Sequence, residues 1–152
     1  MPKFRFRATA ALELRQQQEQ TAAAALARFE ADFREAEASC TAVERQRSIA
    51  QSEQISQARQ GIDASTLFWH RNWIVRLQAT VDELRIEVRQ RADLVEAARK
   101  TWQLARQRRL ALDRMRQRAF GRHSAAEGRE ERRDIDELAR LRFTVPPLGR
   151  EE

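Results

Sequence analysis

The sequence predicts an all-α protein: a long two-helix antiparallel coiled-coil hairpin with a helical C-terminal extension. The three prolines lie at the ends of the chain, and the interior is rich in Ala, Leu, Arg, Gln and Glu, which favour helix. No run alternates between apolar and polar residues with the period of a strand. Apolar residues instead recur every three or four positions. This combination is typical of long helices and coiled coils.

The first arm of the hairpin is expected over residues 3–60, a stretch free of glycine and proline. Its apolar residues step by three and four positions, as in a coiled coil. Towards the N-terminus the stripe is mostly alanine, which permits close approach of a neighbouring helix but buries little apolar area. The stripe comprises Leu26, Phe29, Phe33, Ala36, Cys40 and Val43, and it continues in register through Arg47 to Ala50.

A single break separates two arms of nearly equal length. Gly61 lies in a cluster of turn-forming residues near 52–66. Asp63 and Ser65 are both candidates for the cap of the second helix.

The position of the break also predicts a register between the arms. A turn centred near residue 60 pairs positions whose numbers add to about 120. Val43 is then expected to face Leu77 and Ala36 to face Leu84. Phe4 is expected to lie near Arg116.

The second arm, residues 62–120, carries the stronger coiled-coil pattern. Apolar residues recur every seven positions over about six heptads, which is a sustained signal. The sevenfold positions are Leu67, Ile74, Val81, Val88, Val95 and Trp102. Between them lie Leu77, Leu84, Ala98, Ala105 and Leu112, with His70 and Arg91 interrupting the pattern.

Two regions are therefore expected along the chain. Residues 1–120 are expected to form the hairpin, and residues 121–152 a C-terminal helical extension with a mobile tail. The second region has no counterpart in the first arm. Helix is expected there from about Arg129, and Pro146 with the following proline ends it.

The sequence predicts no catalytic, metal or nucleotide site. The two histidines, His70 and His123, lie far apart, and together with the single Cys40 they lack the spacing of a zinc site. No phosphate-binding glycine loop occurs, and a narrow hairpin offers no deep, dry pocket. We therefore expect a non-enzymatic protein with no cofactor and no small-molecule substrate.

The expected compartment is the cytoplasm. The N-terminus lacks the apolar core of a secretory signal, and no stretch reaches the length of a membrane helix. The lone Cys40 can form no disulfide within the chain, which fits a reducing compartment.

A basic stretch runs from Arg99 to Arg122 and holds nine basic residues with a single acid, Asp113. Two interpretations stay open: a solvated face that keeps the hairpin soluble, and a surface for an acidic protein partner. Nucleic acid is a weaker interpretation, because no nucleic-acid-binding motif accompanies the charge. The candidate partner-binding residues in this stretch are Arg106, Arg109 and Arg116.

An aromatic cluster of Phe68, Trp69 and Trp73 follows the turn. Leu67 and Ile74 occupy the seam between the helices, so both tryptophans cannot point into a two-helix core. They either cover the tip of the hairpin or form a patch that binds a partner.

Short segments near both ends of the chain form a recognisable pattern. They are Lys3-Phe4-Arg5-Phe6, Leu12-Glu13-Leu14-Arg15, the run from Arg108 to Arg116, and Asp134-Ile135-Asp136-Glu137-Leu138-Ala139. These segments resemble the flagellar export protein FliJ family, and the resemblance covers nearly the whole chain. It implies an antiparallel coiled coil similar to the rotor stalk of rotary ATPases. It also implies a non-enzymatic role in flagellar type III protein export and bacterial flagellum biogenesis, with peripheral association at the inner membrane.

The resemblance also implies the partners. The end of the hairpin formed by the two termini is expected to enter the ring of the export ATPase. The half nearer the tip is expected to contact the membrane-embedded export gate, and export chaperones are a further candidate partner. The matching gate-contact positions are Val43 and Gln46 on the first arm and Trp73, Leu77 and Leu84 on the second. The first-arm positions lack the aromatic residues expected of the family.

Three alternative functions are compatible with the same pattern. Stalk proteins of virulence-type secretion systems share the architecture. A basic coiled coil that binds nucleic acid would lose affinity steeply with salt. A self-associating structural coiled coil would not be monomeric in solution.

Overall fold

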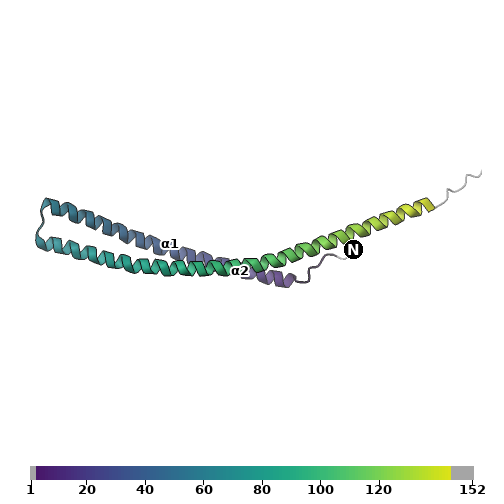
Figure 1. Ribbon diagram of the computed structural model, residues 1–152, viewed down its shortest axis with the longest axis horizontal. Helices are drawn as coiled ribbons and strands as arrows, with labels where there is room; N and C mark the ends of the chain where they lie inside the picture. The colour runs from purple at the N-terminus through teal and green to yellow at the C-terminus, as the bar shows by residue number, and fades with distance from the viewer. Residues whose placement is uncertain (1–2, 145–152) are drawn as a thin grey trace, which may run out of the picture. The chain divides into compact units, whose positions relative to one another are not determined.

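The computed structural model describes residues 3–144, and in that part the chain forms two long α-helices. Helix α1 spans Thr9–Gln60 and helix α2 spans Ala64–Thr144 (Figure 1). The helices pack against each other as the two arms of a hairpin. The predicted all-α hairpin is therefore confirmed.

Contacts divide the chain into two compact units. The hairpin unit is Gln17–Arg106, and the terminal unit combines Met1–Gln16 with Gln107–Glu152. Each unit is described by itself below.

The connection between the helices is shorter than the cluster of turn-forming residues suggests. Between α1 and α2 only residues 61–63 are non-helical, and the serines of the cluster lie inside the two helices. Gly61 has a φ of 85°, in the left-handed region that favours glycine. Of the two candidate caps, Asp63 takes the position before the helix, and its carboxylate accepts a hydrogen bond from the Thr66 hydroxyl. This bond from Thr66 lowers the pKa of Asp63 and keeps its charge at the helix N-terminus.

Two glycine substitutions are expected to change stability in opposite directions. A Cβ at Gly61 meets no atom within 4 Å, but Gly61→Ala forces alanine into the left-handed region and costs about 1 kcal/mol. Gly121 lies within α2 and is also unobstructed, so Gly121→Ala is expected to stabilise the helix by about 0.5 to 1 kcal/mol. Denaturant unfolding measures both, and effects of the same sign would contradict the account.

The core of the hairpin unit is the seam predicted from the heptads. Val81 is fully buried, and the other buried apolar residues repeat at heptad spacing on the two helices. Leu67, also expected on the seam, is 36% exposed because it lies in the first turn of α2, where α1 ends. The buried residues besides Val81 are Ala36, Cys40, Ala50, Leu77 and Val95.

Polar side chains interrupt this seam. His70, only 8% exposed, places its Nε2 2.6 Å from the side-chain oxygen of Gln57 on the other arm. Arg47 donates to the side-chain oxygen of Gln78 at 2.6 Å, while its own buried Nε has no partner. Buried polar pairs of this kind favour one register over alternatives that leave the same groups unpaired.

The register between the arms differs from the one expected. Five cross-arm pairs of the hairpin unit have residue numbers that add to between 123 and 129, instead of about 120. The connection is centred on residue 62, and these positions of α1 contact α2 three to nine residues further along than expected. The pairs are Gln57/His70, Arg47/Gln78, Glu44/Arg85, Asp32/Arg91 and Glu30/Arg99.

In the terminal unit, α2 continues without a break past residue 120. Gly121 and Gly128 are both helical, so the expected C-terminal extension is not a separate element but the last part of α2. Phe4 and Arg116 line the same groove, as expected, and Leu12 is buried in this unit at 3% exposure. The tail expected beyond Thr144, with its two prolines, lies outside the described residues.

Within residues 3–144, neither helix contains a stretch that is both long enough and apolar enough to span a bilayer.

Candidate partner-binding surfaces

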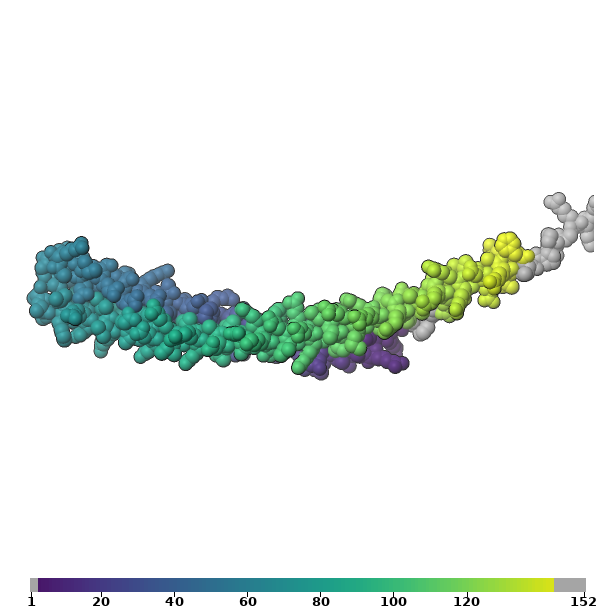
Figure 2. Space-filling model, viewed as in Figure 1, coloured from purple at the N-terminus to yellow at the C-terminus, as the bar shows by residue number. Residues whose placement is uncertain are grey.

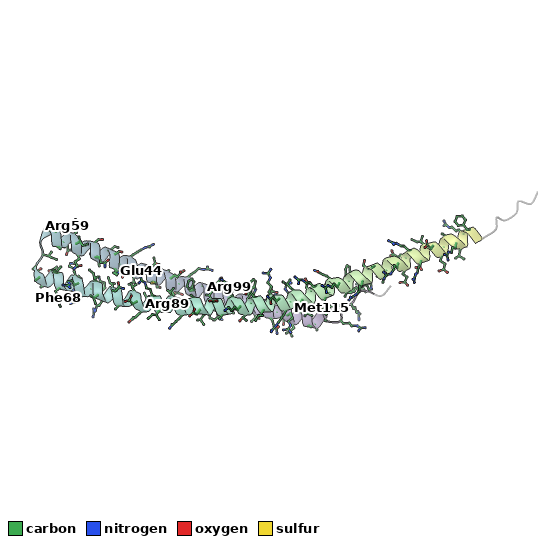
Figure 3. The ribbon with its side chains drawn as sticks, in the orientation of Figure 1. Glu44, Arg59, Phe68, Arg89, Arg99 and Met115 are labelled. Atoms are coloured by element: carbon green, nitrogen blue, oxygen red, sulfur yellow. The ribbon has the colours of Figure 1, made fainter. Side chains whose placement is uncertain are left out.

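The aromatic side chains beside the turn are exposed. Phe68 is 66%, Trp69 62% and Trp73 41% exposed, so neither tryptophan enters the seam. Figure 3 shows Phe68 on α2 next to the turn, with Arg59 at the end of α1. Exposed aromatic groups in one cluster are typical of interaction sites. We refer to Phe68, Trp69 and Trp73 as the tip cluster.

Ion pairs identify one flank of the hairpin unit. Arg85 contacts Glu44 at 2.7 Å across the two arms, and Arg99 contacts Glu30 at 3.6 Å. Both acids lie at the same heptad position of α1 and both arginines at the same heptad position of α2. The hydrogen bond from Arg85 to Glu44 raises the pKa of the arginine. We call this side the Glu44 flank.

The opposite flank carries a second set of charges. Arg91 contacts Glu87 at 2.7 Å and lies 4.0 Å from Asp32. Trp73 precedes Glu87 by two heptads, and Gln46 follows Asp32 by two heptads. Because coiled-coil positions repeat every seven residues, Trp73 and Gln46 lie on this same flank. We call it the Trp73 flank.

The positions implied for the gate contact therefore divide into two groups. Gln46 and Trp73 are exposed on one flank, where a partner can reach both. Leu77 is 5% exposed and belongs to the seam, and Val43 and Leu84 are half-buried at its edges. Because Leu77 is buried, its side chain packs in the seam between the two helices and is not available on the surface.

The basic stretch does not act as one uniform surface. Arg99 is engaged with Glu30, whereas Arg106 is exposed and places its guanidinium 5.3 Å from the centre of the Trp102 ring. In the terminal unit, Arg109 is half-buried and Arg116 is exposed.

An aromatic contact holds the N-terminal segment within the terminal unit. The Phe4 ring centre lies 5.4 Å from that of Phe120 and 5.5 Å from that of His123, both edge-on. His123 in turn lies 3.5 Å from Glu127. Sequence analysis did not identify this contact, because Phe4 lies outside the helical pattern.

The last part of α2 exposes apolar side chains that the sequence analysis did not assign to a surface. Every residue from 129 to 143 is exposed, and Phe143 is 92% exposed. The spacing of the apolar residues resembles a seam, and in the described part of the chain their side chains are exposed. The other members are Ile135, Leu138 and Leu141, which are 64%, 62% and 57% exposed.

No group of three or more His, Cys, Asp or Glu side chains between residues 3 and 144 is arranged to hold a metal ion. Cys40 is a free thiol buried in the seam.

Comparison with known protein families gives one match. The family described as Flagellar FliJ protein matches residues 7–147, nearly the whole chain. Neither the curated proteins nor the solved structures contain a match to this chain.

Proposed function

The chain belongs to the flagellar FliJ protein family and is a non-enzymatic component of the flagellar export apparatus, and within it we propose that the chain is a stalk coupling the export ATPase ring to the export gate. Export chaperones are a further proposed partner. The proposed location is the cytoplasm, at the inner-membrane site of the export apparatus.

The observation that carries this proposal is the separation of two unlike surfaces on one long hairpin. Trp73 belongs to the exposed aromatic tip cluster, whereas Arg106 on the same helix belongs to the basic stretch. These two residues lie roughly 50 Å apart along α2 at the helical rise per residue. Two partners can therefore bind the hairpin without overlapping.

The chemistry of each surface suggests its partner. An exposed tryptophan on the same flank as an exposed glutamine offers an apolar anchor and a polar group, as in protein interfaces, and we assign Trp69, Trp73 and Gln46 to the gate. The arginines of the basic stretch fit an acidic surface, and we assign them to the ATPase ring.

The test of this proposal is the activity of the purified export ATPase with and without the chain. We expect the chain to raise ATP hydrolysis or ring assembly. A triple variant, Arg106→Gln with Arg109→Gln and Arg116→Gln, should lose most of this effect. Its matched control changes three arginines outside the basic stretch, namely Arg28→Gln, Arg45→Gln and Arg89→Gln. Unchanged ATPase activity and oligomeric state on adding the unaltered chain would contradict the proposal.

A further inference from the structure

The tip of the hairpin unit is poor in charge and rich in exposed apolar side chains. Residues 49–76 contain only five charged side chains, whereas charged residues make up 34% of the whole chain. The tip cluster is joined there by further exposed apolar residues. They are Ile49, Ile55, Leu67 and Val75, which are 59%, 56%, 36% and 67% exposed.

These apolar groups lie on both flanks of the hairpin. Trp73 occupies the flank named after it, together with Gln46. Val75 lies on the Glu44 flank. It precedes Gln78 by three residues, and Gln78 precedes Arg85 by one heptad, so all three share one side of α2. Phe68 lies one heptad before Val75 on the same side.

Helix α1 contributes to the Glu44 flank as well. Ile55 follows Glu44 by eleven residues, about three helical turns, so it shares that face of α1. Figure 2 shows α1 and α2 packed together beside the turn. The heptad positions of Phe68, Val75 and Ile55 place apolar groups on the flank opposite Trp73. A flat protein surface can contact only one of these flanks, whereas a lipid interface into which the tip inserts can contact both.

The tip carries three arginines and two acids, Glu53 and Asp63, so its net charge is small and positive. Arg59, Arg71 and Arg76 form no ion pair within the described residues. Further along the hairpin unit, Arg85 and Arg91 are both paired with acids. Unpaired arginines beside exposed tryptophan and phenylalanine match the headgroup region of a membrane, where aromatic rings lie at the interface and cations contact anionic lipid.

We propose that the tip of the hairpin inserts its apolar side chains into the interface of an anionic lipid membrane. Phe68, Trp69 and Trp73 enter the boundary between headgroups and acyl chains, and Arg59, Arg71 and Arg76 contact the anionic headgroups. The proposal requires no protein partner and is tested on vesicles alone. Trp69 and Trp73 are also assigned to the gate above, so one copy of the chain uses them either for the lipid or for the gate.

Asp63 limits the depth of this insertion. Its carboxylate lies in the turn, and the hydrogen bond from Thr66 lowers its pKa, so it stays charged. A charged carboxylate is costly in hydrocarbon, which keeps the turn itself at the level of the headgroups.

The experiment uses the full chain carrying Trp102→Phe, so that tryptophan emission reports only Trp69 and Trp73. The probes are vesicles of phosphatidylcholine alone and vesicles with one third phosphatidylglycerol. On the anionic vesicles we expect a shift of emission to shorter wavelength and quenching by brominated acyl chains. Co-sedimentation should be about tenfold stronger or more than with phosphatidylcholine alone.

A matched pair of variants locates the insertion. Phe68→Ala with Val75→Ala keeps both reporter tryptophans and should weaken binding about tenfold. Leu94→Ala with Leu104→Ala removes two residues that are 49% and 53% exposed further along the hairpin unit, and it should leave binding unchanged. Circular dichroism confirms that both variants stay helical.

Two results would overturn the proposal. Sedimentation with anionic vesicles without any change in tryptophan emission would mean that the basic stretch, and not the tip, holds the membrane. Equal loss of binding in the tip variant and its matched control would mean that no specific part of the hairpin inserts.

Discussion

Replacing Val81 with aspartate is expected to lower the free energy of unfolding by at least about 3 kcal/mol. Val81 is fully buried in the seam, so Val81→Asp removes an apolar contact and also buries a carboxylate without a partner. The hairpin has only a narrow core, which cannot rearrange around the charge. Thermal and denaturant unfolding followed by circular dichroism measure the effect.

The matched control is Val75→Asp, which introduces the same charge on the same helix. Val75 is 67% exposed, so its substitution should change stability by no more than about 0.5 kcal/mol. Equal losses at the two positions would show that helicity in this chain depends on intrinsic propensity instead of the seam.

Trp73→Ala is expected to weaken binding to the export gate by about 30-fold to 100-fold, equivalent to roughly 2 to 3 kcal/mol, while the helix content stays unchanged. Trp73 is 41% exposed on the flank that also presents Gln46, so its truncation removes an interface anchor and little of the core. Titration of the solubilised gate protein with each variant measures the affinity.

Leu77→Ala provides the contrasting case, because Leu77 is buried at heptad spacing from Val81. It should lose about 2 kcal/mol or more of stability. Its effect on gate binding should follow the fraction of folded protein. A large loss of helicity in Trp73→Ala would instead identify Trp73 as a core residue and remove it from the proposed interface.

The arms of the hairpin were predictable because a two-helix coiled coil repeats one signal many times. Each heptad of α2 places another apolar residue on the seam, from Ile74 to Val95, and the buried residues follow that pattern. Gly61 was identifiable as the break because no other glycine lies between the arms.

The register was harder to predict, because it depends on where each helix ends. The serines around Gly61 suggested a wide turn, but serine is tolerated in helices, and the cap at Asp63 begins α2 immediately after a short connection. A shift of two residues in the centre of the turn moves every cross-arm pair.

Helix α2 stays continuous because its two interior glycines destabilise the helix only slightly. Gly121 and Gly128 each cost about 1 kcal/mol relative to alanine in a helix, which is too little to interrupt a long helix between strong helix formers.

The exposure of Trp69 and Trp73 was left open by the sequence, because a tip residue beside the seam can fold over it or turn away. The structure shows that both turn away.

The central claim is that one hairpin binds the export ATPase and the export gate at separate surfaces. The most direct test mixes the purified chain with both partners and measures whether a single complex contains all three. We expect such a complex, with the gate lost selectively in Trp73→Ala and the ATPase lost selectively in the triple variant of Arg106, Arg109 and Arg116. Competition between the two partners for the chain, or binding of neither, would contradict the claim.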